Sequence, residues 1–198
     1  LRKISLIDQK EIIQRLNLMS NIVAVVPARI GSGRLPGKVM MQVLGKPLLG
    51  HLLDRLEKCC EVDEIVVATP DSEENDLIAD YCDSREVITF RGSEDDVLDR
   101  LVKALVWRNA SIGVLVFGDC PLIDPDIVTK VINYYMSYPG YDFVGNDLRT
   151  TYPPGMEVEV FSVDALKDSA NRCRDISIRE HSTLYVRTHP EIYRLKNL

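Results

Sequence analysis

The sequence has 198 residues, of which 45% are hydrophobic and 27% are charged, and its formal net charge is -6. This composition is typical of a globular domain, and the negative charge argues against general binding to nucleic acids or anionic membranes, which needs clustered excess cations. The five cysteines show no Cys-x-x-Cys pair and no zinc spacing, and no apolar run is long enough to span a bilayer. We therefore expect reduced cysteines, a cytoplasmic location, and neither nucleic acid nor membrane as a partner.

The predicted core begins after residue 20. We expect residues 1–20 to be an N-terminal extension outside the core, because Met19 lies almost directly before the first apolar run, where a natural start often lies. From residue 21 to residue 198, strand and helix patterns alternate without a linker rich in glycine and serine. This continuity predicts a single domain over 21–198.

Short apolar runs indicate buried strands, and the first of them covers 22–26. Apolar residues at helical spacing are clearest over 94–107, and Asp124 before Pro125 is typical of a helix start. This alternation predicts a mostly parallel sheet covered by helices on both faces, a three-layer α/β/α fold of the Rossmann-like type. Further strands are expected near 65–68, 87–90, 112–117, 141–144 and 156–161, and further helices near 47–56, 73–82, 163–170 and 178–188.

A loop with clustered cations follows the first strand. Residues 27–38 contain Arg29, Arg34 and Lys38 together with three glycines. Loops at the carboxyl ends of parallel strands are where open α/β sheets bind ligands. Glycines let backbone amides approach an anion, and the cations add charge and hydrogen-bond donors. The pattern therefore predicts a phosphate chain as the ligand, and the alternative is a basic surface loop that caps the strand.

This loop matches neither of the two common phosphate-binding motifs. A Walker A loop has glycine six residues before its lysine and serine or threonine after it, whereas this chain has Ser32 and Val39 at those places. In the Rossmann dinucleotide fingerprint, Pro36 takes the place of the third glycine. The sequence therefore disfavours both a P-loop kinase and an NAD enzyme.

A second candidate feature follows the strand at 112–117. Gly118 and Asp119 leave its carboxyl end, which places one carboxylate on the same rim as the basic loop. Because Mg²⁺ in nucleotide enzymes is held by one or two carboxylates and by substrate phosphates, Asp119 is the best candidate metal ligand. The alternative is a turn aspartate that bonds its own backbone. Cys120 has no identifiable base partner, so we interpret its thiol as packing.

The loop over 28–38 resembles the signature of the sugar-acid cytidylyltransferases, which include the synthetases of CMP-sialic acid and CMP-Kdo. The nearest resemblance is to the branch of spore coat polysaccharide biosynthesis protein F. The likeness runs in order from about residue 22 to about residue 190. Besides the loop, it rests on 91–98, 118–124, Tyr152-Pro153 with Gly155, and Arg179-Glu180-His181.

This resemblance implies a nucleotide-diphospho-sugar transferase fold and an Mg²⁺-dependent nucleotidyltransferase. The implied reaction transfers CMP from CTP to the anomeric hydroxyl of an acidic sugar, like a sialic acid or Kdo, for surface polysaccharide biosynthesis. It releases pyrophosphate. By motif, Lys38, Arg29 and Asp119 would be the catalytic residues, and Asp119 would also bind the metal. The implied nucleotide-binding residues are Ala28, Arg29, Gly31, Ser32, Gly33, Arg34, Lys38 and Arg91.

The other matched positions have two interpretations each. Arg91 lies before a helix and could face the base or the ribose, but Ser93 in the same segment could simply cap that helix with Asp96 in its first turn. Glu157 and Glu159 alternate along one expected half-exposed strand and so share a face, which could reach the sugar or metal or only face solvent.

The motif at 179–181 is equally open. Arg179 or His181 could contact the sugar carboxylate or a partner subunit. Glu180 forms a capping-box pattern with Ser177, which explains it without a function.

The resemblance departs from the family after residue 195. Relatives usually continue to a further aspartate segment. We therefore expect a C-terminally truncated domain, a substitute ligand among Asp147, Glu157 and Glu159, or an impaired enzyme. Relatives also commonly dimerise, and 152–185 is the candidate surface for a homodimer. Two other functions remain open: a nucleotidyltransferase of the same fold that uses another nucleoside triphosphate, and a non-catalytic nucleotide-binding or assembly module.

Overall fold

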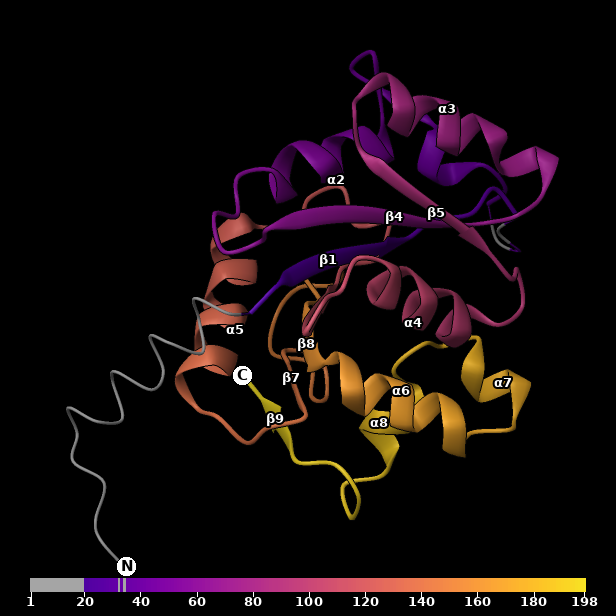
Figure 1. Ribbon diagram of the computed structural model, residues 1–198. Coiled ribbons are helices and arrows are strands. Elements are labelled where there is room, and N and C mark those ends of the chain that lie inside the picture. Colours follow the sequence, from indigo (N-terminus) through magenta and orange to yellow (C-terminus); the bar gives the residue numbers. More distant parts are fainter. Residues whose placement is uncertain (1–19, 32, 34) are drawn as a thin grey trace, which may run out of the picture.

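A computed structural model describes residues 20–31, 33 and 35–198 of the chain (Figure 1). The expected N-terminal extension, except residue 20, lies outside these residues, and so do two predicted nucleotide-binding residues, Ser32 and Arg34. In the part that is described, no helix has both the length and the apolar character that crossing a bilayer requires.

One sheet of seven strands organises the described residues, in the order β5-β4-β1-β6-β8-β7-β9. Strand β1 pairs in parallel with both β4 and β6, whereas β8 is antiparallel to its neighbours β6 and β7. The mostly parallel sheet predicted from the sequence is therefore confirmed. The strands are β1 (Ile22–Pro27), β4 (Glu64–Pro70), β5 (Ile88–Gly92), β6 (Ile112–Leu115), β7 (Phe143–Gly145), β8 (Glu159–Ser162) and β9 (Leu195–Asn197).

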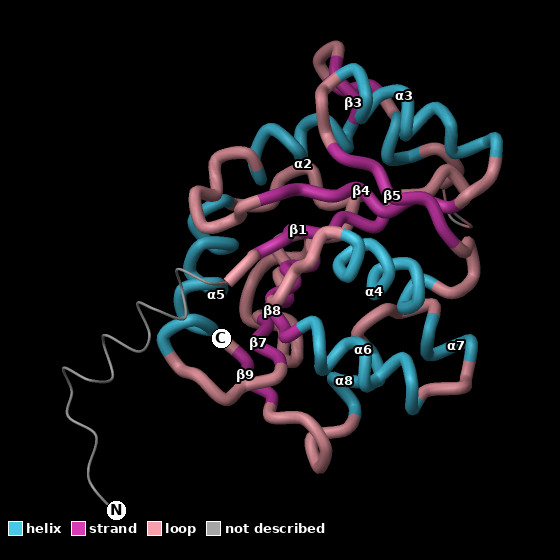
Figure 2. Tube along the Cα trace, in the orientation of Figure 1, coloured by secondary structure: helices cyan, strands magenta, loops and turns pink. Residues whose placement is uncertain are grey.

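Helices cover both faces of the sheet, which gives the expected three layers (Figures 1 and 2). Ile22, Ala24 and Val26 of β1 pack on one face with α2, α3 and α5. Val23 and Val25 point to the opposite face, because side chains alternate along a strand, and pack with α4, α6 and α8. The helices are α2 (Leu48–Leu56), α3 (Asp76–Ser84), α4 (Val97–Trp107), α5 (Pro125–Ser137), α6 (Val163–Arg172), α7 (Ile176–Arg179) and α8 (Leu184–Thr188).

Short elements complete the described chain. Two 3-10 turns, η1 (Lys38–Met40) and η2 (Glu73–Asn75), precede α2 and α3. A hairpin of β2 (Gln42–Val43) and β3 (Lys46–Pro47) connects η1 to α2. Neither this hairpin nor β9 was expected from the sequence, because each of their strands is only two or three residues long.

Helix α4 begins three residues later than predicted, and its cap is Asp96 instead of Ser93. The Asp96 carboxylate accepts a hydrogen bond from the backbone N of Asp99 at 2.9 Å. Ser93 Oγ accepts one from the backbone N of Asp96 at 3.1 Å and so orders the preceding turn. A carboxylate at the N-cap accepts a hydrogen bond from a backbone amide that has no partner within the helix. Its negative charge also interacts favourably with the positive end of the helix dipole.

The helix expected over 178–188 is divided into α7 and α8. Ser182 has a φ of 46°, a left-handed conformation that interrupts a right-handed helix. The predicted capping box of Ser177 and Glu180 is also wrong, because α7 begins earlier with Asp175 as its cap. The Asp175 carboxylate accepts hydrogen bonds from the backbone N of Ser177 at 2.9 Å and from its Oγ at 2.7 Å. Glu180 is thereby left to face the site described below.

The expectation of a half-exposed strand at 156–161 is wrong as well. Strand β8 begins only at Glu159, and both of its edges are paired, with β6 on one side and β7 on the other. Glu159 has none of its surface exposed to solvent. Glu157 precedes the strand, and its carboxylate accepts a hydrogen bond from the backbone N of Gly155 at 2.7 Å. The two glutamates therefore do not form an exposed acidic face.

Candidate active site

The carboxyl ends of β1 and β6 bring the two predicted motifs together. The backbone N of Gly118 donates a hydrogen bond to the carbonyl of Pro27 at 3.1 Å. A Cβ atom at Gly118 would lie only 2.7 Å from that carbonyl oxygen and 3.1 Å from the Cβ of Ala28. Glycine is therefore needed here for the close approach of the two loops, which carry Arg29 and Asp119.

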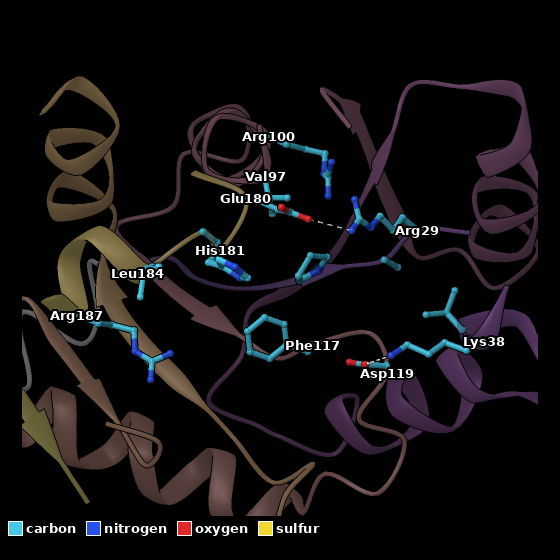
Figure 3. A pocket seen from close by; sticks show the side chains of 14 residues that line it. Arg29, Lys38, Val97, Arg100, Phe117, Asp119, Glu180, His181, Leu184 and Arg187 are labelled. Atoms are coloured by element: carbon cyan, nitrogen blue, oxygen red, sulfur yellow. Dashed lines mark hydrogen bonds and ion pairs between the residues drawn. The ribbon is translucent and has the colours of Figure 1, made fainter. Parts of the chain in front are cut away.

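A cavity of about 570 Å³ opens at this junction (Figure 3). Its volume lies in the range of small-molecule sites. One wall comes from the end of β1, from η1 and from the segment after β6, and the other comes from α4 and the α7–α8 segment. The lining residues are Pro27, Ala28, Arg29, Lys38, Val39, Val97, Arg100, Phe117, Asp119, Glu180, His181, Ser182, Leu184 and Arg187.

The described ends of the basic loop are fixed by hydrogen bonds to a buried side chain and to each other. The backbone N of Ile30 donates to Oδ1 of Asn75 at 2.9 Å, and the backbone N of Gly37 donates to the carbonyl of Ile30 at 2.8 Å. Asn75 is fully buried and donates to Oγ of Ser72 at 2.8 Å. The segment that precedes α3 thus holds the start of the loop, a role of Asn75 that no sequence motif indicates.

Lys38 and Asp119 form an ion pair inside the cavity (Figure 3). Lys38 begins η1, and Asp119 follows β6. Two of the three predicted catalytic side chains are thus paired, and the third, Arg29, lines the same cavity. Among the described residues, no group of three or more His, Cys, Asp or Glu side chains could hold a metal ion. A half-exposed carboxylate in a cavity of small-molecule size fits Mg²⁺, which commonly takes one or two protein carboxylates and its other oxygens from phosphates and water.

Arg29 makes an ion pair across the cavity. Its Nη2 lies 3.2 Å from Oε1 of Glu180, which follows α7 on the opposite wall (Figure 3). The side chains are 34% and 47% exposed, respectively. Partly exposed pairs of this kind contribute little free energy, so a ligand anion can replace Glu180 on Arg29.

A buried acidic cluster holds Arg187, another cation of the wall. Nη1 of Arg187 lies 2.8 Å from Oε1 of Glu159, and Nη2 lies 2.8 Å from Oδ2 of Asp147. Oγ1 of Thr183 donates to the second oxygen of Glu159 at 2.6 Å. Burial, and then the charge of Asp147, raise the pKa of Glu159, and burial also raises the pKa of Asp147. Arg187 was not identified from the sequence.

Among the remaining described residues of the predicted loop and motifs, two line this cavity, whereas Gly31 and Gly33 do not. Ala28 and His181 line it. A Cβ at Gly31 would lie 3.1 Å from Oε1 of Glu94, whereas Gly33 has open space around its Cα.

Two predicted arginines do not line the cavity and have other partners. Arg91 pairs with Asp76 and donates to the carbonyl of Ser72 at 2.7 Å. Arg179 pairs with Asp96 at 2.8 Å and donates to the backbone carbonyls of Ala170, in the last turn of α6, and of Cys173, just after that helix. It therefore fastens α7 to α4 and to the end of α6. Their predicted roles in nucleotide and sugar binding therefore have no support from the placement of these side chains.

A mostly parallel sheet with a cation-lined cavity at its carboxyl edge places the chain among the α/β proteins that bind ligands at the carboxyl ends of their strands. The sequence model of the cytidylyltransferase family matches residues 23–198. The chain belongs to the cytidylyltransferase family and is a nucleotidyltransferase.

Known proteins resemble the chain over most of its length. Spore coat polysaccharide biosynthesis protein SpsF of Bacillus subtilis is 33% identical over 186 residues, which cover 91% of this chain and 75% of that protein. A 3-deoxy-manno-octulosonate cytidylyltransferase of Trichlorobacter lovleyi is 35% identical over 119 residues, 60% of this chain and 46% of that enzyme. The structure of a cytidylyltransferase from Leptospira borgpetersenii has a TM-score of 0.87 at 30% identity and covers 90% of this chain and 76% of its own.

Proposed function

We propose that this chain is an Mg²⁺-dependent cytidylyltransferase that transfers CMP from CTP to the anomeric hydroxyl of an acidic sugar. The observation that carries the proposal is the Lys38–Asp119 ion pair, which lies in the same cavity as Arg29 and Arg187. One end of this cavity thus combines a cation for phosphate with a carboxylate for a divalent metal. The other end adds a further cation near His181, where an acidic acceptor could bind.

In the proposed reaction, the anomeric oxygen of the sugar attacks the α-phosphorus of CTP. The bond from that phosphorus to the bridging oxygen of the β-phosphate breaks, pyrophosphate leaves, and the hydroxyl proton passes to solvent. Arg29 and Lys38 would bind the triphosphate and stabilise the charge that develops on it. Asp119 would hold Mg²⁺, which when bound supplies further neutralisation of the phosphate oxygens.

The acidic acceptor is supported by charge and by the names of relatives. Arg187 is held on the wall by buried carboxylates, so it presents a fixed cation to the cavity. A carboxylate-bearing sugar would interact favourably with such a cation. SpsF is named for polysaccharide biosynthesis, and the Trichlorobacter enzyme for 3-deoxy-manno-octulosonate, a sugar acid.

Pyrophosphate release tests this function. Each of the four nucleoside triphosphates is mixed with a panel of 2-keto sugar acids that includes 3-deoxy-manno-octulosonate, with Mg²⁺ or with EDTA. We expect release with CTP and one sugar acid, only with Mg²⁺. Asp119→Ala should abolish the release, whereas Asp164→Ala, which removes an exposed carboxylate of α6, should leave it unchanged.

Two other outcomes would identify the competing functions. Release with a different nucleoside triphosphate would indicate another nucleotidyltransferase of the same fold. Binding of CTP without release for any sugar acid would favour a non-catalytic module. The homodimer through 152–185 stays a prediction, which the molar mass in solution tests.

A further inference from the structure

Arg100 is a buried arginine that has no acid partner among the described residues. It lies near the start of α4, is 1% exposed, and is the largest of the fully buried side chains in the described chain. Its Nη1 donates to the backbone carbonyls of Ser93 and, at 3.3 Å, Glu94. Its Nε is buried without a hydrogen-bond partner, and no ion pair with Arg100 occurs within the described residues.

The other cations of the cavity differ from Arg100 in this respect. Arg29, Lys38 and Arg187 each lie within ion-pair distance of a carboxylate. Glu94 and Asp96 act on Arg100 only at longer range, while burial and the charge of nearby Arg29 lower its pKa to about 10. Arg100 is therefore charged at neutral pH, and a buried charge without a counter-ion is costly in free energy. An anion bound in the cavity would offset that cost.

The side chain is also built into position. Figure 3 shows the guanidinium of Arg100 pointing into the cavity, toward Arg29 and Glu180. A Cβ atom at Gly92 would lie 3.1 Å from Cγ of Arg100, so the glycine leaves room for the arginine stem. The two backbone carbonyls hold Nη1 of the guanidinium in place, and the Nε–H of Arg100 has no protein acceptor among the described residues.

We propose that Arg100 is a further anion-binding residue of this cavity, whose guanidinium binds the phosphate chain of the nucleotide beside Arg29. The choice of phosphate over the acceptor carboxylate follows from position, because Arg100 lies next to Arg29 of the nucleotide loop. This inference rests on the proposed function in that it takes a nucleoside triphosphate as the ligand. It adds a binding residue from α4, an element outside the phosphate loop.

Isothermal titration with inorganic tripolyphosphate and with CTP tests the inference on the full chain. Arg100→Met should bind both ligands at least about 10-fold more weakly, since a charge-assisted hydrogen bond to phosphate is lost. Lys103→Met is the matched control, because Lys103 lies on the same helix with 64% of its side chain exposed and pairs with Asp99. Its affinities should equal those of the wild type.

A loss of CTP affinity without any loss of tripolyphosphate affinity would overturn the inference, because Arg100 would then contact another part of the nucleotide. Unchanged affinities for both ligands in a folded Arg100→Met protein would also overturn it. If the wild type bound neither ligand, the proposed function would fail together with this inference. If it bound both, a negative result for the variant would leave the proposed function intact.

A measurement on the wild type covers the case in which Arg100→Met does not fold. The Nε–H signals of ¹⁵N-labelled arginines are recorded, and the signal of Arg100 is assigned by its absence in Arg100→Lys. Added tripolyphosphate should shift that signal, because its buried Nε–H gains an acceptor or a nearby charge. An unmoved signal at saturation with tripolyphosphate would contradict the proposal.

Discussion

Nη1 of Arg187 lies 2.8 Å from Oε1 of Glu159, a carboxylate that has no exposed surface. Asp147 holds the other terminal nitrogen of the same guanidinium at 2.8 Å. Two acids thus share one cation, and the pKa of Glu159 rises to about 8, first because of burial and then because of the charge of Asp147. The cluster fixes a cation on the cavity wall and stores a proton up to about pH 8.

This stored proton predicts a dependence of stability on pH. The folded protein keeps the Glu159 proton up to about pH 8, whereas the unfolded chain releases it near the ordinary pKa of 4.5. The folded state therefore binds up to one more proton between these values, and the free energy of unfolding falls as pH rises through the window. Glu159→Gln removes this contribution, so urea unfolding between pH 5 and pH 8 should show a smaller fall for the variant.

Asp164→Asn serves as the control for that series, because its carboxylate is almost fully exposed. Its pH dependence should follow the wild type. Parallel curves for wild type and Glu159→Gln would show that Glu159 is ionised in the folded protein throughout the window. The proposed proton storage would then be wrong.

Glu180 is predicted to compete with the nucleotide for Arg29. Glu180→Gln removes its charge, and the partly exposed pair is worth at most about 1 kcal/mol, so CTP should bind up to about 5-fold more tightly. Isothermal titration measures the change. Glu191→Gln, on an exposed loop before β9, is the control with no expected effect. Weaker binding of CTP to Glu180→Gln would mean that Glu180 holds the ligand instead of competing with it.

Lys38 should matter for catalysis much more than for stability. Lys38→Met removes a partly exposed ion pair, so the melting temperature should change little. Loss of a cation beside the transferred phosphate should lower kcat/KM for CTP at least about 100-fold. Lys58→Met, an exposed position just after α2, is the control in the pyrophosphate assay. Wild-type kcat/KM in Lys38→Met would remove Lys38 from the proposed mechanism.

Gly118 is predicted to be essential for the junction of the two loops. Its substitution by alanine would force a Cβ against the carbonyl of Pro27, a backbone atom that cannot move without shifting β1. We expect Gly118→Ala to lose about 1–3 kcal/mol of unfolding free energy. Thermal unfolding of both variants measures this change. A Cβ at Gly33 would lie in open space, so Gly33→Ala should keep the stability of the wild type. Equal stability of both variants would contradict the packing described here.

The sequence located the part of the site that depends on strand order. Arg29, Lys38 and Asp119 were predicted together because the carboxyl ends of parallel strands meet at one rim, and the structure places all three in one cavity. Their roles in catalysis and metal binding stay predictions. The three-layer fold followed from the alternation of strand and helix patterns, which depends on local spacing alone.

The opposite wall could not be derived in this way. Glu159 was expected on a half-exposed strand, since only the pairing of β8 with two neighbours reveals that it is buried. Arg187 belongs to a five-residue helix without a clear periodicity. Arg100 did leave a signal, because a charged residue among the buried apolar positions of α4 is unusual. Its meaning depends on the cavity, which the sequence does not display.

The most direct test of the account is a crystal structure of the protein with CTP and Mg²⁺. We predict that the triphosphate lies in the cavity between Arg29 and Lys38, with a metal ion on the carboxylate of Asp119 and with Glu180 no longer paired to Arg29. A nucleotide bound elsewhere, or an empty cavity in which Lys38 still pairs with Asp119 at saturating CTP, would contradict the account.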